Sequence, residues 1–309
     1  MKILITGIHG FVGTNMVEAF KETSMIFGLD IITLPNPGVS KSFAWNDLEH
    51  IPSVDVIIHL AGKAHDLKKV SSEQEYYDIN VGLTKKIFNH FLNSSTRKFI
   101  YFSSVKAAAD IVGHSPLTEQ DFPSPQTHYG KSKLEAEKHI LHSTIPTSRK
   151  VYIVRPAMIH GPGNKGNLNI LYSLISRGIP YPLGKYENKR SFTSIRNLLY
   201  IINKLVTEEI EPGTYNICDD ESLSTNELVR LIAHSINRPP RLLKIPKILI
   251  DRIAHAGSFL RLPFNSEVLM KLTESYVVSN LKIKNALSIE SLVVNAREGM
   301  VETFRSFQS

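Results

Sequence analysis

Apolar residues in the first half of the chain alternate between short β-branched runs and longer segments in which they recur every three or four positions. The short runs predict buried strands at Lys2–Thr6, Met25–Leu29, Val54–Leu60, Lys98–Ser103 and Val151–Arg155. Helical spacing at Ser72–Leu92 and after Thr127 predicts helices between these strands. Such alternation is typical of an α/β fold with a Rossmann, doubly wound parallel sheet.

The pattern becomes less regular after residue 160. Residues 161–167 form a loop rich in Gly and Asn, and Thr214–Cys218 predicts a short returning strand. Ser224 and Glu227 have the spacing of a capping box at a helix start. We therefore expect a dinucleotide-binding domain at 1–160, to which later segments can return, and a smaller mixed C-terminal substrate lobe at 161–309.

The stretch Arg241–Leu262 is basic and amphipathic, which would suit a helix on a membrane surface. Pro246 and Gly257 interrupt it, and core packing explains its apolar residues, so we expect no stable membrane association. No run of eighteen or more apolar residues predicts a membrane span. The tail Ser288–Phe307 predicts a closing helix.

Composition narrows the class of protein. The 309 residues, 42% hydrophobic and 21% charged, suit an ordinary globular protein. The net charge of +7 would attract an anionic partner, but Lys and Arg form no concentrated tract, so a phosphorylated substrate is favoured over nucleic acid. Cys218 is the only cysteine, and the amino terminus enters a strand without a leader; both suit the cytoplasm.

Three glycines follow the first strand and precede a helical pattern: Gly7, Gly10 and Gly13. Strand, glycine turn and helix form the context of a dinucleotide fingerprint, here spaced G-x-x-G-x-x-G. Glycine permits the tight turn and lets the backbone approach a pyrophosphate, which the helix amino terminus attracts. We interpret the turn as a dinucleotide site; a purely structural loop is the alternative.

Asp30 ends the second strand, twenty residues after Gly10. A carboxylate there accepts hydrogen bonds from the ribose hydroxyls and repels a 2′-phosphate, and neither Ile31 nor Ile32 supplies a cation for that phosphate. NAD is therefore favoured over NADP, unless Asp30 is an ordinary turn residue. His59 and His65 suggest a metal, but no cysteine or carboxylate cluster with ligand spacing lies nearby, so none is expected.

Tyr129 and Lys133 are four residues apart at the start of a predicted helix, which places them on one face. A fixed ammonium favours a phenolate, and lowering the phenol pKa by about three units needs roughly 4 kcal/mol. We expect the lysine, helped by a positively charged nicotinamide ring, to supply it. The pair predicts an acid–base centre; chance spacing on a solvated face is the alternative. Ser103 and Ser104 stand at the carboxyl end of a strand, where ligands bind in open α/β sheets.

Together these motifs resemble the extended short-chain dehydrogenase/reductase family, specifically its nucleotide-sugar epimerase/dehydratase group, over nearly the whole chain. The matching segments are Thr6–Gly13, Asp30 and Pro125–Lys133. The resemblance implies that Tyr129 is the acid/base and that Lys133 holds the nicotinamide ribose and tunes Tyr129. It also implies that Ser104 hydrogen-bonds the reacting sugar oxygen, with Ser103 the weaker candidate.

The same resemblance implies the binding residues. Cofactor contacts are expected at Gly7, Gly10, Phe11, Val12, Gly13, Asp30, Leu60, Ala61, Gly62, Asn80, Tyr129 and Lys133. Substrate contacts are expected at Ser103, Lys106, Asn167 and Arg190, the last of which matches the family's arginine for the substrate diphosphate. NAD, a UDP-sugar and a homodimer formed partly by the Tyr129 helix are the implied cofactor, substrate and assembly.

The residues after Ser104 separate the subclasses. Sugar 4,6-dehydratases of this fold carry an Asp-Glu pair there, because eliminating water needs an extra acid and base; here Val105 and Lys106 occupy these positions. Redox chemistry at C4 is therefore expected. We predict an NAD-dependent 4-epimerase of UDP-glucose/UDP-galactose or UDP-N-acetylhexosamine type that acts through a transient 4-keto sugar. The alternative is an NAD(P)H-dependent 4-ketoreductase of a UDP-4-keto-6-deoxy amino sugar.

Two departures leave the substrate open. Met158 stands where well-known family epimerases carry an Asn, and Lys106 stands where they carry a small or hydroxyl residue. Both departures resemble the branch found with bacterial surface-polysaccharide enzymes. A non-catalytic dinucleotide sensor is a hypothesis of a different class, but the presence of both Tyr129 and Lys133 argues against it.

Overall fold

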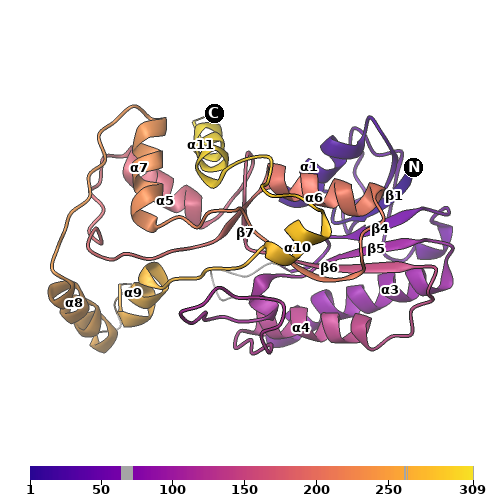
Figure 1. Ribbon diagram of the computed structural model, residues 1–309, viewed down its shortest axis with the longest axis horizontal. Helices are drawn as coiled ribbons and strands as arrows, with labels where there is room; N and C mark the ends of the chain where they lie inside the picture. The colour runs from indigo at the N-terminus through magenta and orange to yellow at the C-terminus, as the bar shows by residue number, and fades with distance from the viewer. Residues whose placement is uncertain (64–71, 261, 263, 309) are drawn as a thin grey trace.

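The computed structural model describes residues 1–309 except 64–71, 261, 263 and 309 (Figure 1). A seven-stranded parallel sheet lies at its centre, in the order β3-β2-β1-β4-β5-β6-β9. The strands are β1 Lys2–Thr6, β2 Met25–Leu29, β3 Lys41–Phe43, β4 Val56–His59, β5 Lys98–Phe102, β6 Lys150–Pro156 and β9 Gly213–Ile217. The predicted α/β Rossmann sheet is confirmed.

The strand order reverses direction at β1, because the chain first builds outward through β2 and β3 and then crosses to β4. Thr6, the last residue of β1, is level with Leu29 of β2 and His59 of β4. In open α/β sheets, a crevice forms at the carboxyl ends of strands at such a reversal, and ligands bind there. We therefore expect a ligand site at the loops after β1, β4 and β5.

Helices cover both faces of the sheet, as Figure 1 shows. On one face, α1 (Phe11–Phe20), α6 (Ile195–Thr207) and α10 (Leu281–Ala286) share a core with β1 and β6. On the other face, α3 (Leu83–Asn93) and α4 (His128–Leu141) bury apolar side chains against β4 and β5. Both faces of the central strands are thus buried, which accounts for their continuous β-branched and aromatic runs.

A smaller group of elements lies beyond the carboxyl edge of the sheet, in the left half of Figure 1. It comprises β7 (Met158–His160), β8 (Phe192–Ser194), α5 (Asn167–Ser176), α7 (Thr225–Ser235), α8 (Lys247–Phe259), α9 (Ser266–Thr273) and α11 (Ala296–Ser306). β7 and β8 form a separate parallel pair. These helices have their own apolar core. Strand β9 pairs with β6 of the large sheet, and the division at residue 160 stays a prediction.

Several elements differ from those expected. The short edge strand β3 was missed, and the closing helix α11 begins at Ala296 rather than Ser288, because the Asn295 side chain caps it by accepting from the Glu298 N–H. The helical region predicted at Ser72–Leu92 consists of α2 (Glu73–Tyr76), the π-helix η2 (Tyr77–Gly82) and α3. Two short 3₁₀ helices, η1 (Leu48–His50) and η3 (Val105–Ala107), were not predicted.

Within the described ranges, every helix is too short or too polar to cross a lipid bilayer.

Candidate active site

The turn between β1 and α1 requires glycine at two positions. Gly7 has a φ of +73°, and a Cβ there would lie 2.9 Å from the Ala61 nitrogen; a Cβ on Gly13 would lie 2.1 Å from the Gly7 carbonyl oxygen. Gly10 is the N-cap of α1 and has no side chain to accept from the first-turn N–H groups, while Phe11 and Val12 are partly exposed. This helix start therefore fits a pyrophosphate.

Asp30 lies at the edge of this turn. One oxygen of its buried carboxylate accepts from the His9 N–H at 3.2 Å and the other from the Ile31 N–H at 2.7 Å, which fixes its orientation. Ile31, 82% exposed, and Ile32 offer no cation on the solvent side. The residues present therefore fit a dinucleotide with free adenosine ribose hydroxyls, as in NAD, better than one with a 2′-phosphate.

A buried polar chain fixes the loop after β4. Thr6 Oγ1 accepts from the N–H groups of Leu60 and Ala61 at 3.1 and 2.9 Å and hydrogen-bonds His59 Nδ1 at 2.7 Å. His59 Nε2 meets Thr84 Oγ1 at 3.0 Å. Burial lowers the pKa of His59 to about 3, so this ring is neutral and acts as a structural bridge.

The other histidine considered for a metal, His65, lies outside the described residues. Among the described residues, no three or more His, Cys, Asp or Glu side chains gather closely enough to hold a metal ion.

Asn80 connects the loop after β4 to α4. Its side chain, fully buried in the π-helix η2, accepts from the Lys63 N–H at 2.7 Å and donates to Ser132 Oγ at 2.9 Å. A Cβ on Gly62 would lie 2.9 Å from Asn80 Oδ1, so the loop backbone runs directly over the amide. Asn80 therefore positions the exposed Gly62 turn rather than facing solvent itself.

The three predicted catalytic residues converge beside this turn. Thr127 caps α4 by accepting from the Gly130 N–H at 3.2 Å, which places Tyr129 in the first turn. Tyr129 hydrogen-bonds the side chain of Ser104, the residue that caps η3. Lys133, one turn further along α4, donates to the Phe102 carbonyl at 2.8 Å, and its Nζ would lie 3.1 Å from a Cβ on Gly62.

Burial has the largest effect on the pKa values of Tyr129 and Lys133. It raises the pKa of Tyr129, against a hydrogen bond from Ser104 that lowers it. It also lowers the pKa of Lys133 to about 8, against an opposing effect of the Glu137 carboxylate. Without a cofactor, desolvation thus disfavours both the phenolate and the ammonium. The lowered Tyr129 pKa that we expect from Lys133 together with a positively charged nicotinamide stays a prediction.

The lowered pKa of Lys133 gives a testable pH dependence. Its folded-state pKa of about 8 lies below the unfolded value of about 10.4, so the unfolded chain binds the proton more tightly. The free energy of unfolding should therefore rise as the pH rises through 8. Between pH 7 and 9 we expect wild type to gain about 1 kcal/mol relative to Lys133→Met, measured by urea denaturation. Parallel pH curves for the two proteins would contradict the lowered pKa.

Ser103 is directed elsewhere. Its hydroxyl donates to Glu137, whose carboxylate also accepts from Arg155, with Nε at 2.9 Å from Oε1. All three side chains are buried, and Glu137 is fully inaccessible. Ser104, not Ser103, thus meets Tyr129. Sequence reasoning missed Glu137, although its position four residues after Lys133 places it on the same helix face.

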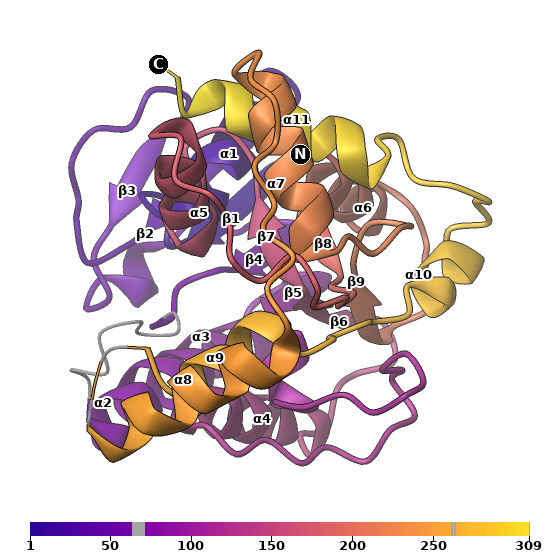
Figure 2. The same cartoon turned by 90° about the vertical axis from the view of Figure 1, so that its left-hand side faces the viewer.

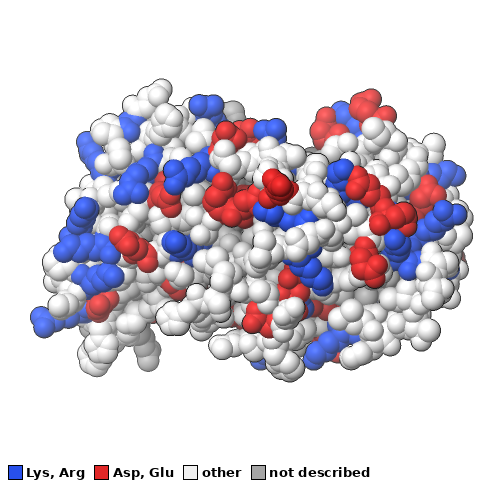
Figure 3. Space-filling model, viewed as in Figure 1, with Lys and Arg blue, Asp and Glu red and all other residues white. Residues whose placement is uncertain are grey.

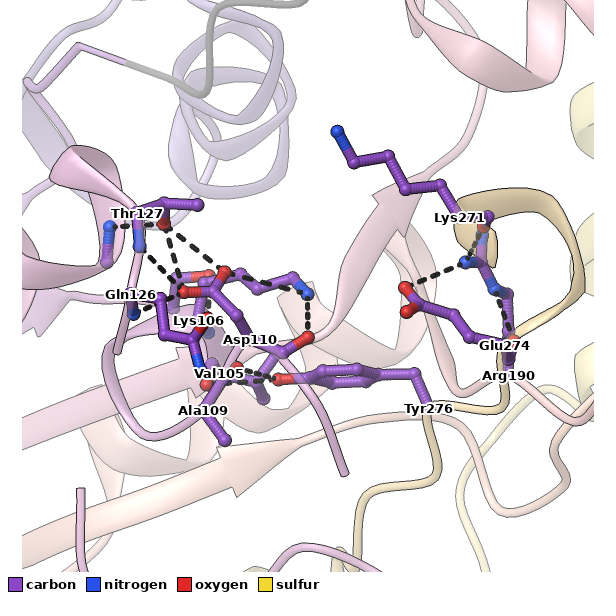
Figure 4. A network of polar contacts seen from close by, with 12 residues as sticks. Val105, Lys106, Ala109, Asp110, Gln126, Thr127, Arg190, Lys271, Glu274 and Tyr276 are labelled. Carbon is purple, nitrogen blue, oxygen red and sulfur yellow. Dashed lines mark hydrogen bonds and ion pairs between the residues drawn. The ribbon is translucent and has the colours of Figure 1, made fainter. Parts of the chain in front are cut away.

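Lys106 belongs to a second polar network, shown in Figure 4. Its Nζ donates to the Asp110 carbonyl at 2.9 Å and lies 4.1 Å from the centroid of the Tyr276 ring. The Asp110 carboxylate accepts from the N–H groups of Gln126 and Thr127 at 2.7 and 2.9 Å. Asp110 thereby connects the η3 segment to the start of the Tyr129 helix, a role that the sequence did not indicate.

Arg190 lies on the other side of Tyr276 in the same view. Its guanidinium donates to the Lys271 carbonyl and pairs with Glu274 at 3.4 Å. Burial lowers the pKa of Lys106, while the Asp110 and Glu274 carboxylates oppose this shift. The charge of Arg190 also lowers that pKa, so the two cations are close enough to interact. The Tyr276 hydroxyl donates to the Ala109 carbonyl at 2.6 Å, which connects the two sides.

The remaining predicted substrate residue, Asn167, is exposed in the first turn of α5. Within the described part of the chain, no hydrogen bond or ion pair joins it to Lys106 or Arg190. The structure thus brings together the glycine turn, Asp30, the Gly62 loop and the Ser104–Tyr129–Lys133 group. It places Lys106, two residues after Ser104, and Arg190 on opposite sides of Tyr276.

Comparison with known proteins places this geometry in context. Residues 3–218 match the NAD dependent epimerase/dehydratase family. The UDP-glucose 4-epimerase of Vibrio cholerae is 31% identical over 258 residues, which cover 79% of this chain and 78% of that protein. The N-acetyl-alpha-D-glucosaminyl-diphospho-ditrans,octacis-undecaprenol 4-epimerase of Escherichia coli O157:H7 is 28% identical over 302 residues, or 91% of this chain and 84% of that protein.

Among solved structures, the UDP-N-acetylglucosamine 4-epimerase from Bacillus cereus superposes with a TM-score of 0.78 at 20% identity, covering 100% of both chains. This likeness extends the shared fold to the smaller lobe as well as the sheet.

Proposed function

This chain belongs to the NAD-dependent epimerase/dehydratase family, and from that premise we propose that it is an NAD-dependent 4-epimerase of UDP-sugars. The observation that carries the proposal is the convergence of Ser104, Tyr129 and Lys133 at the carboxyl end of β5, beside the Gly62 turn. The non-acidic residues Val105 and Lys106 after Ser104 favour C4 redox chemistry over dehydration.

We assign the cofactor site to the two loops at the reversal of the sheet. NAD, when bound, supplies the hydride acceptor and donor for C4 of the sugar. Asp30 binds the adenosine ribose, the first turn of α1 binds the pyrophosphate, and Lys133 holds the nicotinamide ribose. The backbone contacts come from Gly7, Gly10, Phe11, Val12, Gly13, Leu60, Ala61 and Gly62, and Asn80 positions the last of these loops.

In this mechanism Tyr129 is the acid and base. Its phenolic oxygen takes the proton of the C4 hydroxyl when the sugar is oxidised and returns it when the 4-keto sugar is reduced on its other face. Ser104 donates a hydrogen bond to the same sugar oxygen and so orients it. Burial raises the Tyr129 pKa, and the positive charge of a bound nicotinamide would act in the opposite direction and favour the phenolate.

We place the substrate diphosphate at Arg190, with Lys106 as a second cation, and the nucleotide end near Asn167 at the start of α5. Ser103 is committed to Glu137, which leaves Ser104 to bind the sugar. We further propose a cytoplasmic homodimer whose interface includes α4.

A lipid-linked sugar is a second candidate substrate. The E. coli relative that covers 91% of this chain is named for a sugar carried on diphospho-undecaprenol. Such a molecule presents the same diphosphate and hexosamine as a UDP-sugar, so the same Arg190 and Tyr129 would act on it. Whether the protein recognises the nucleotide or the lipid carrier then determines which of the two molecules is its substrate.

One assay tests these assignments. Purified protein is incubated with UDP-glucose, UDP-N-acetylglucosamine or N-acetylglucosaminyl-diphospho-undecaprenol, without added cofactor. We expect conversion to the 4-epimer of at least one, with NAD retained by the protein. Activity that appears only with a UDP-4-keto sugar and reduced nicotinamide would replace epimerase by ketoreductase. Dinucleotide binding without turnover of any of these sugars would indicate a sensor.

A further inference from the structure

Helix α8 has two apolar faces, only one of which is buried. Ile250, Ala254 and Gly257 face the protein, where a Cβ on Gly257 would lie 2.0 Å from the Phe264 carbonyl oxygen. The sequence prediction that core packing explains the apolar residues of this stretch is therefore correct for this narrow face and for Leu242 and Ile245, which pack against the same core, but not for the rest of the helix. The remaining apolar side chains lie in solvent.

The exposed apolar face is broad and continuous. Its members are Ile248, Leu249, Ile253, Ala256, Phe259 and Leu260. At about 100° per residue they occupy an arc of roughly 140°, which only Arg252 interrupts. Phe259 is 86% exposed and Leu260 62%. On the adjacent α9, joined to α8 through Ser258 and Ser266, Met270 and Leu272 are exposed as well.

The stretch of sequence that contains this face is basic. Between residues 241 and 262 the sequence has five Lys or Arg and one acid, Asp251. That acid accepts a hydrogen bond from Tyr186 at 2.7 Å. In Figure 3 the edge of the molecule that carries α8 shows more Lys and Arg than Asp and Glu around uncharged surface. An exposed apolar stripe in a basic stretch of chain is the pattern of a helix that lies at the surface of an anionic bilayer.

We propose that the exposed face of α8, extended by α9, binds reversibly to the surface of an anionic lipid bilayer. The helix has 13 residues and is about 20 Å long, too short to span a hydrocarbon core of about 30 Å, so it lies in the interface. Arg252 extends its charge from the apolar arc toward the lipid headgroups. A second copy of this chain is a poorer partner, because two-fold pairing would bring like charges together.

The position of this face suits a lipid-linked sugar. The carbonyl of Lys271, in α9, accepts from the Arg190 guanidinium, and Glu274 follows that helix and pairs with the same group. Figure 2 shows α8 and α9 side by side along one side of the molecule. The segment that would contact the membrane thus also holds the arginine that we assign to the substrate diphosphate. Binding to lipid itself does not depend on the sugar that is converted.

Co-sedimentation with vesicles tests the proposal. We expect the full-length protein to bind phosphatidylglycerol/phosphatidylethanolamine vesicles at low salt, more weakly at high salt, and poorly to phosphatidylcholine vesicles. The double variant Phe259→Ser/Leu260→Ser should lose about tenfold or more in vesicle affinity. Leu281→Ser, in α10, is the matched control, since Leu281 is as exposed as Leu260, at 62%.

Further measurements separate the other outcomes. Arg252→Glu should weaken binding several-fold and reduce its salt dependence. Circular dichroism and turnover of a soluble UDP-sugar should be unchanged in all three variants, which separates this proposal from the assigned catalysis. The proposal is overturned if wild type does not sediment with anionic vesicles or if the double variant and Leu281→Ser bind alike. It is equally overturned if the double variant changes only the oligomeric state in analytical ultracentrifugation.

Discussion

Replacing Tyr129 by Phe should reduce turnover by about a thousandfold, while the fold and the binding of NAD are retained. Phenylalanine keeps the ring, which packs edge-on against Tyr76 at a centroid distance of 6.3 Å, but removes the oxygen that exchanges a proton with C4. The loss should appear in kcat more than in KM, because the missing interaction serves the reacting oxygen and not the diphosphate.

A matched control is available in α6. Tyr200→Phe removes a phenolic oxygen from a partly buried ring that lies 5.8 Å from Lys204 Nζ, a contact that phenylalanine retains. Its turnover should equal that of wild type. Dinucleotide binding to both variants is measured by fluorescence titration or calorimetry. If Tyr129→Phe turned over the sugar at near the wild-type rate, with Tyr200→Phe as reference, another group would be the acid and base.

The sheet and the glycine turn could be predicted because their signals are local. Strands buried on both faces need continuous apolar runs, and for β1 and β2 the predicted runs have the same bounds as the observed strands. The requirement for Gly7 and Gly13 follows from a turn conformation and a close backbone approach. The spacing of Tyr129 and Lys133 likewise expresses helix geometry alone.

The contacts that complete the site could not be predicted, because they join distant parts of the chain. The Tyr276 hydroxyl meets the Ala109 carbonyl across 167 positions of sequence. Burial, which decides the pKa of Tyr129, is likewise a property of the fold. That only one of Ser103 and Ser104 faces the site could be predicted from the sequence, because neighbouring residues at a strand end point to opposite sides.

The same difference between local and long-range information explains why the exposed face of α8 was not predicted. Its sequence contains enough apolar residues for a core helix, but the pattern does not say how many of them the lobe covers. Only three positions face the protein, and Gly257 lets the backbone of Phe264 approach closely. A helix whose apolar arc is wider than the face it buries needs a second apolar environment or leaves the rest of that arc in water. The exposed fractions of these side chains, added to the basic composition of the stretch, therefore support membrane binding.

Replacing Glu137 by Leu should lower the free energy of unfolding by about 3–5 kcal/mol, because Arg155 would become an uncompensated buried charge. Arg155 is only 4% exposed, and Ser103 would lose its acceptor as well. The matched control is Glu135→Leu, two residues away on the exposed side of α4, whose carboxylate lies 3.9 Å from Lys138. That exposed change should stay within about 0.5 kcal/mol of wild type in urea denaturation at pH 7.

The double variant Glu137→Leu/Arg155→Met shows whether the loss comes from the unpaired charge. With both charges removed and apolar volume retained, most of the stability should return, since a buried ion pair contributes little over well-packed apolar residues. A single variant as stable as Glu135→Leu would mean that the Glu137 carboxylate does not hold Arg155. If the double variant were no more stable than Glu137→Leu, the loss of stability would come from altered packing and not from the unpaired charge. Because Glu137 also supports the protonated form of Lys133, recovery of stability need not restore turnover.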